Sequence, residues 1–122
     1  WFDNIHFEES GKPSLFDFDF CGNGWLVHDL GYYLYQLFYT NPDKGLYEEK
    51  ATAFLEGYQT IRPLTKEEKR LIRYCSTATL LFYISVQCDT FNNWSNIFLN
   101  EEHLKRYTEN MKRWMDYQGL DI

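Results

Sequence analysis

The sequence predicts a mainly α-helical fold of the α+β class, in which a short β-hairpin is followed by about four helices. Two extended segments lie near the start, and most of the chain after residue 28 repeats apolar side chains at helical spacing. The length of 122 residues suits one domain with a single core. We expect residues 1–28 to form the hairpin part and residues 29–122 the helical part of that one domain.

The hairpin is predicted from two strands joined by a turn. Ile5-His6-Phe7 is typical of a short strand, and residues 14–20 alternate apolar and acidic side chains, which indicates a second strand. Residues 8–13, between them, contain the Gly and Pro that favour turns. A loop follows at residues 21–24, because Gly and Asn tolerate backbone conformations that other residues resist.

The first two helices are predicted from apolar stripes. Asp29 is the expected N-cap of the first, since its carboxylate can accept a hydrogen bond from an unpaired backbone N–H. Its stripe consists of Leu30, Tyr33, Leu34, Leu37 and Phe38. Residues 40–43 break this helix, and a second one should end before Arg62-Pro63. The apolar face of the second helix consists of Tyr47, Ala51, Phe54, Leu55 and Tyr58.

Two more helices follow. Residues 65–68, Thr-Lys-Glu-Glu, form a capping box that should open a long third helix. Its expected inner face holds Leu71, Cys75, Ala78, Phe82 and Val86. Residues 78–86 are apolar nearly all round, so we expect this stretch to be central. The last helix, over residues 101–117, should bury Leu104, Tyr107, Met111 and Trp114 and expose Lys105, Arg106, Lys112 and Arg113.

Charge and cysteine content exclude several classes of protein. The net charge of −6 disfavours binding to nucleic acid or to anionic membranes. No apolar run approaches the about 20 residues of a membrane span, and no signal peptide is recognisable, so we expect a cytoplasmic protein. The three cysteines, Cys21, Cys75 and Cys88, form no CxxC pair, and we expect buried free thiols rather than disulfides or a zinc site.

An acidic pair in the predicted hairpin is the strongest sign of chemistry. Asp17 and Asp19 are two residues apart, so on a strand they would share one face. Two like charges at close range are costly unless water or a metal compensates them. Asn4, on the neighbouring strand, adds an amide oxygen. This donor set suits Mg²⁺ holding the phosphates of a nucleotide, and the alternative is an exposed face that is merely acidic.

Residues 3–30 resemble the active-site segment of the aminoglycoside phosphotransferase and choline kinase-like family, small-molecule kinases with a protein-kinase-like fold. The family pattern runs H-G-D-x-x-x-x-N, a short strand, a turn, a hydrophobic segment ending in D-[FW]-[DE], a Gly-containing loop, and [YH]-D-[LI] at the start of a helix. The chain matches from Asn4 onward, in Asp17-Phe18-Asp19, Gly22, Gly24 and His28-Asp29-Leu30. A less specific similarity continues through residues 54–58 and 62–68.

The resemblance implies a role for each matched residue. Asn4 corresponds to the catalytic-loop Asn that binds magnesium, and Asp17 to the aspartate that is the main ligand of the Mg²⁺ bridging the β- and γ-phosphates. Asp19 would assist that metal directly or through water. Asp29 would be a structural acid that orders the catalytic loop by hydrogen bonds. The implied cofactors are Mg²⁺ and ATP or GTP.

The resemblance also implies that part of the site lies outside these residues. The family's catalytic base would precede Trp1, and Asp3 has the wrong spacing to replace it. The Gly-rich nucleotide loop and the Lys–Glu pair belong to an N-terminal lobe that is missing here. We therefore expect the chain to be the C-terminal lobe of a kinase and to be inactive by itself, because catalysis in this class depends on positioning and charge stabilisation.

In this family the helical lobe forms the pocket for a small-molecule hydroxyl acceptor. Aromatic side chains that could line it are Trp25, Tyr32, Tyr33, Tyr83, Trp94 and Trp114, although any of them could instead pack in the core. An acidic, aromatic pocket suits an amine-bearing acceptor. An aminoglycoside, choline or ethanolamine, a sugar, homoserine and a protein side chain all remain open.

Two other interpretations compete with a kinase. Haloacid-dehalogenase-like phosphatases also use D-x-D after an apolar strand, but they need a doubly wound α/β body, which the helical remainder of this chain does not predict. A non-catalytic helical interaction module would explain the helices. It would leave Asn4, Asp17 and Asp19 as a coincidence.

Overall fold

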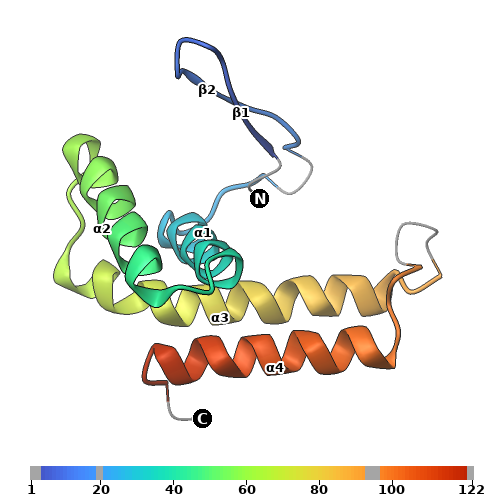
Figure 1. Ribbon diagram of the computed structural model, residues 1–122. Coiled ribbons are helices and arrows are strands. Elements are labelled where there is room, and N and C mark those ends of the chain that lie inside the picture. Colours follow the sequence, from blue (N-terminus) through green and yellow to red (C-terminus); the bar gives the residue numbers. More distant parts are fainter. Residues whose placement is uncertain (1–3, 19–20, 93–96, 121–122) are drawn as a thin grey trace.

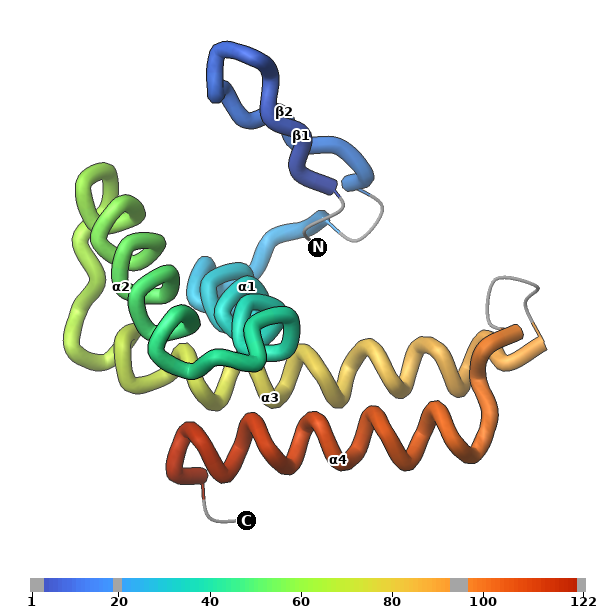
Figure 2. The backbone as a smooth tube through the Cα atoms, viewed as in Figure 1, coloured from blue at the N-terminus to red at the C-terminus, as the bar shows by residue number. Residues whose placement is uncertain are grey.

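The computed structural model describes residues 4–18, 21–92 and 97–120, and it confirms the predicted fold class. The described residues form a two-stranded hairpin and four helices (Figure 1). Their bounds are β1 Ile5–Phe7, β2 Pro13–Leu15, α1 Val27–Thr40, α2 Lys44–Ile61, α3 Lys66–Asp89 and α4 Glu101–Tyr117. Helices α3 and α4 run antiparallel side by side, α1 packs across α3, and the hairpin projects beyond α1 (Figure 2).

The hairpin pairs β1 and β2 in antiparallel register, with Ile5 opposite Leu15 and Phe7 opposite Pro13. Its turn contains Gly11 at φ 80°, a left-handed conformation that glycine adopts without steric cost. The alternation predicted a second strand over residues 14–20, but the observed strand is shorter. It ends at Leu15, and Asp17 has a φ of 62°. Asp17 therefore does not lie in the strand, and the prediction for Asp19 falls outside the described residues.

Helix α1 supplies the largest share of the core, as its apolar stripe predicts. Leu30, Leu34, Leu37 and Phe38 are buried. Gly31 allows the close approach of α1 to α3, since a Cβ there would lie 2.7 Å from the carbonyl oxygen of Ile72. The start of this helix differs from the prediction, because Leu26 occupies the N-cap position and Asp29 lies in the first turn. An acidic side chain in the first turn is favoured by the helix dipole without being the cap.

Local capping signals set the starts of the other helices. The Asp43 carboxylate accepts a hydrogen bond from the backbone N–H of Leu46 at the start of α2. The capping box at the start of α3 is confirmed, because Thr65 accepts from the Glu68 N–H and Glu68 accepts from the Thr65 N–H. Arg62 also donates to the Glu68 carboxylate.

Glu68 makes stability depend on pH. Hydrogen bonds, first from Arg62 and then from the Thr65 backbone, lower the pKa of Glu68 from 4.5 to about 2. A depressed folded-state pKa means that the stabilisation is fully present above about pH 4.5 and is lost as the pH falls toward 2. We expect the urea midpoints of the wild type and of Glu68→Gln to converge over that window. A difference that stays constant down to pH 2 would contradict this assignment.

The second half of α3 is not central, contrary to the prediction from its all-round apolar sequence. Leu80 is 1% exposed, but Leu81 and Phe82 are 49% and 52% exposed. The buried face of α3 consists of Ile72, Cys75, Ser76, Thr77 and Leu80, so Ala78 and Phe82 fall outside it. The physical reason is that α1 crosses mainly the first half of α3, with α4 along the opposite side, so no other described helix covers the α1 side of the second half (Figure 1).

Helix α4 contributes one fully buried side chain to the core. Trp114 is fully buried, and its indole N–H donates to the Ser76 hydroxyl at 2.8 Å. Tyr107 donates to the Leu80 carbonyl at 2.6 Å, which attaches the first half of α4 to α3. The predicted solvated face is confirmed, because Lys105, Arg106, Lys112 and Arg113 are exposed. Leu104, expected on the buried face, is 37% exposed.

All three cysteines are free, as predicted, but only Cys75 is buried, whereas Cys21 and Cys88 are exposed. Burial raises the pKa of the Cys75 thiol, so this cysteine behaves as a small apolar side chain. No helix within the described ranges is long and apolar enough to cross a membrane.

Candidate functional site

The hairpin brings Asn4 and Asp17 into direct contact. Asn4 immediately precedes β1 and Asp17 follows β2, so pairing of the two strands closes the distance between them. The Asn4 amide Nδ2 donates to Asp17 Oδ2 at 3.2 Å. One further backbone bond, from the Phe16 N–H to the Asn4 carbonyl at 3.2 Å, extends the pairing beyond the strands. Two of the predicted site residues are therefore neighbours.

Asp17 has an unusual backbone conformation. Its φ of 62° makes it the one non-glycine residue with a positive φ among the described residues. Asp and Asn are the residues that tolerate this left-handed region best, because their short side chains can bond locally. Such strain is typical of functional sites, where a side chain must be aimed in a particular direction. The conformation ends the extended segment at the point where the carboxylate meets Asn4.

The connection from the hairpin to α1 is anchored at His28. The Thr79 hydroxyl on α3 donates to the Cys75 carbonyl at 2.9 Å, so its oxygen accepts from His28 Nδ1, which lies 3.1 Å away. Trp25 stacks on the His28 ring, with centroids 5.7 Å apart. This contact fixes the first turn of α1, which also carries Asp29. The Asp29 side chain is exposed and has no hydrogen-bond partner among the described residues, so its loop-ordering role stays a prediction.

Tyr83, on α3, is affected by the charges of two predicted site residues. Burial raises the pKa of Tyr83, and the negative charges of Asp17 and then Asp29 raise it further. Both carboxylates therefore lie within electrostatic reach of this one phenol. Tyr83 also stacks on Tyr32 of α1, with ring centroids 5.1 Å apart. Tyr83 was expected from the sequence as an aromatic wall residue. Its position near the two aspartates was not, because no spacing in the sequence reveals it.

The other aromatic candidates for an acceptor pocket separate into two groups. Trp114 is a core residue with no exposed surface, and Tyr33 is half-buried and stacks on Phe54 with centroids 4.1 Å apart. Trp25 is 75% exposed. Trp94 lies outside the described residues. Tyr83, which senses the two aspartates, and Tyr32, which stacks on Tyr83, therefore remain as candidates for the pocket wall.

Asn4 and Asp17 fit part of a magnesium site. Mg²⁺ in phosphoryl-transfer sites is usually held by one or two carboxylates together with substrate phosphates and waters, and an amide oxygen is an acceptable ligand. The residues that the structure describes contain no group of three His, Cys, Asp or Glu side chains that could hold a metal alone. Rotation of the Asn4 amide about its last torsion would turn Oδ1 rather than Nδ2 toward the ion.

Comparison with known proteins identifies a family for the chain. The sequence model of the phosphotransferase enzyme family matches residues 1–64, which include β1, β2, α1 and all four predicted site residues. No solved structure matches the chain significantly.

Three curated relatives are similar to the chain. A homoserine kinase of Polaromonas naphthalenivorans is 36% identical over 57% of the chain, and one of Gluconobacter oxydans is 24% identical over 92%. An uncharacterized protein of Synechocystis sp. is 29% identical over 90%. The matched segments span 22%, 35% and 29% of these relatives' own lengths, respectively. The family model matches more than half of the residues of this chain, and the chain therefore belongs to the phosphotransferase enzyme family.

Proposed function

We propose that the chain is the C-terminal lobe portion of a Mg²⁺-dependent small-molecule kinase, which transfers the γ-phosphoryl group of ATP or GTP to a hydroxyl acceptor. The observation that carries the proposal is the 3.2 Å contact between Asn4 and Asp17 inside the segment that matches the phosphotransferase family. The left-handed Asp17 backbone supports it, because the carboxylate is aimed at the expense of local strain.

In this proposal Asp17 supplies the main carboxylate ligand of Mg²⁺ and Asn4 supplies an amide oxygen. Bound Mg²⁺ neutralises charge on the β- and γ-phosphates during transfer. Asn4 holds Asp17 by a hydrogen bond, so both groups already converge on one point. We propose Asp19 as an additional ligand, directly or through water. Asp29 acts as a positioning residue at the start of α1, beside the His28 anchor.

The remaining parts of the machinery are proposed to lie in a longer protein. The curated relatives are about three to five times as long as the segments they share with this chain. We place the catalytic base before Trp1 and the Gly-rich loop with its lysine in an N-terminal lobe. Because positioning and electrostatics dominate this chemistry, we expect residues 1–122 alone to be inactive.

We propose an amine-bearing hydroxyl compound as the acceptor, with homoserine the first to test. Two relatives carry the name homoserine kinase, and homoserine has both a hydroxyl and an ammonium group. The Tyr83 phenol lies within electrostatic reach of Asp17 and Asp29, and Tyr32 stacks on Tyr83. A surface of this kind attracts a cation through its charge and its ring faces.

The test is a phosphoryl-transfer assay on the full-length natural protein. ATP and GTP are each combined with homoserine, choline, ethanolamine or an aminoglycoside, with Mg²⁺ or with excess chelator. We expect a phosphorylated product from an amine-bearing acceptor, dependent on Mg²⁺. Absence of transfer to any hydroxyl acceptor, together with absence of nucleotide binding, would favour the helical interaction module instead.

A further inference from the structure

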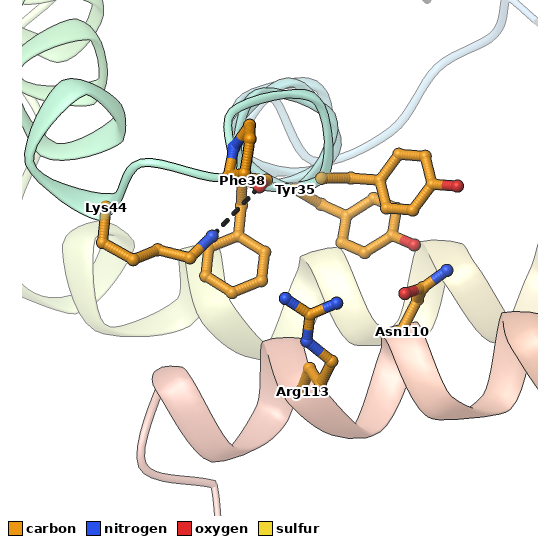
Figure 3. A pocket seen from close by; sticks show the side chains of 7 residues that line it. Tyr35, Phe38, Lys44, Asn110 and Arg113 are labelled. Carbon is orange, nitrogen blue, oxygen red and sulfur yellow. Dashed lines mark hydrogen bonds between the residues drawn. The ribbon is translucent and has the colours of Figure 1, made fainter.

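A small cavity lies where the end of α1, the start of α2 and the middle of α4 meet (Figure 3). Its volume is about 140 Å³, close to the roughly 150 Å³ of an engineered cavity that holds one benzene ring, so it can admit a compact ligand. Its lining consists of Tyr35, Phe38, Tyr39, Pro42, Lys44, Asn110 and Arg113.

Lys44 is held in a fixed position at this cavity. Its ammonium nitrogen lies 3.3 Å from the centroid of the Phe38 ring. It donates to the Phe38 carbonyl at 3.2 Å and to the Asn41 carbonyl at 3.3 Å. An ammonium group has three donors, so one N–H remains for a further acceptor. The lysine is thus a preorganised cation rather than a freely moving one.

Arg113 approaches the same space from α4. Figure 3 shows its guanidinium and the Lys44 ammonium beside the Phe38 ring, with Asn110 next to Arg113 on α4. Within the described part of the chain, the Arg113 guanidinium has no ion pair or hydrogen bond. A guanidinium offers five N–H donors in a planar fork that matches an oxyanion. All of them remain available to a ligand.

No carboxylate of the described residues forms an ion pair with either of these two cations. The cavity lining contains no Asp or Glu, and the acids nearest to Arg113 along α4, Glu109 and Asp116, are not part of it. Desolvation lowers the pKa of Lys44, and the charge of Arg113 lowers it further, as expected of two like charges that repel each other. In a chain of net charge −6, this is a local concentration of positive charge. A bound anion would reduce the repulsion between Lys44 and Arg113.

We propose that this cavity binds a compact oxyanion of the phosphate type, held by the Arg113 fork and the fixed Lys44 ammonium. The Asn110 amide and the tyrosine hydroxyls of the lining can add neutral donors. The site is distinct from the proposed kinase centre. Asp29 lies in the first turn of α1 and Phe38 near its last, which separates them by roughly 14 Å along the helix at about 1.5 Å per residue.

The test is calorimetric titration of the full-length natural protein with inorganic phosphate, with chloride adjusted to keep the ionic strength constant. We expect saturable binding that Arg113→Gln weakens at least about tenfold, the loss of roughly one charge-assisted hydrogen bond. Lys112→Gln is the matched control, since it removes the same charge from the neighbouring exposed residue outside the cavity. Sulfate should compete with phosphate, because it is a similar oxyanion.

Two further measurements accompany the titration. Circular dichroism should show that Arg113→Gln is folded, because Arg113 is exposed. Asp17→Asn should leave the phosphate affinity unchanged, which separates this site from the proposed magnesium site and makes the two proposals fail independently. Absence of saturable binding, equal affinities of the wild type and Arg113→Gln, or equal losses in Arg113→Gln and Lys112→Gln would each overturn the anion site.

Discussion

Asp17→Asn in the full-length protein is expected to lower the rate of phosphoryl transfer at least about 10³-fold, equivalent to about 4 kcal/mol of transition-state stabilisation. The neutral amide cannot replace the carboxylate as the main ligand of Mg²⁺, although it occupies almost the same volume. Asp17 is exposed, and its described side-chain bond is the one from Asn4, so the fold should persist. Steady-state rates at saturating nucleotide and acceptor measure the loss.

Glu9→Gln is the matched control for Asp17→Asn. Glu9 lies in the turn of the same hairpin, is exposed, and loses the same charge, but it is remote from the Asn4–Asp17 contact. We expect its activity to stay within about twofold of the wild type, since surface charges alter local electrostatics only weakly in salt. An Asp17→Asn enzyme as active as Glu9→Gln would show that Asp17 is not the metal ligand.

Trp114→Ala is expected to lower the free energy of unfolding by about 3–5 kcal/mol, the cost of removing a fully buried large aromatic side chain. Trp114 contacts rings from two other helices: it meets Tyr35 and Phe38 of α1 edge-on at 5.9 and 5.2 Å, and Tyr47 of α2 at 6.4 Å. Its removal leaves a void among all of them. Urea unfolding followed by far-ultraviolet circular dichroism gives the change.

Trp25→Ala makes the same chemical change at a side chain that is 75% exposed, and it should cost much less. Trp114→Phe refines the interpretation, because it keeps an aromatic ring but removes the indole N–H that bonds Ser76. We expect Trp114→Phe to fall between the other two variants. Equal destabilisation by Trp25→Ala and Trp114→Ala would contradict the burial of Trp114.

Signals that act over a few residues were read correctly from the sequence. The capping box at Thr65 and Glu68 is local chemistry, and it is present as predicted. Four apolar side chains of α1 recur at helical spacing on one face of the helix, and that face is buried. The prediction that the second half of α3 is central was wrong, because apolar composition does not show which faces of a helix pack against other elements. Phe82 is half-exposed, since α1 crosses mainly the first half of that helix.

The candidate site shows the same division. Asn4 and Asp17 could be identified from a motif with fixed spacing, and the hairpin register explains why they meet. The alternation of residues 14–20 suggested a strand through Asp17, but alternation cannot reveal a left-handed backbone at one residue. Tyr83 and Asp17 are far apart in the sequence, and so are Lys44 and Arg113. Their proximity follows from helix packing and could not be predicted from the sequence.

The central claim is that Asp17 holds a divalent metal together with a nucleotide. The most direct measurement is electron paramagnetic resonance of Mn²⁺, used in place of Mg²⁺, with the full-length protein and ATP. The account predicts protein-bound Mn²⁺–ATP in the wild type and in Glu9→Gln, and an affinity at least about tenfold weaker in Asp17→Asn. An unchanged Mn²⁺–ATP affinity in Asp17→Asn would contradict the account.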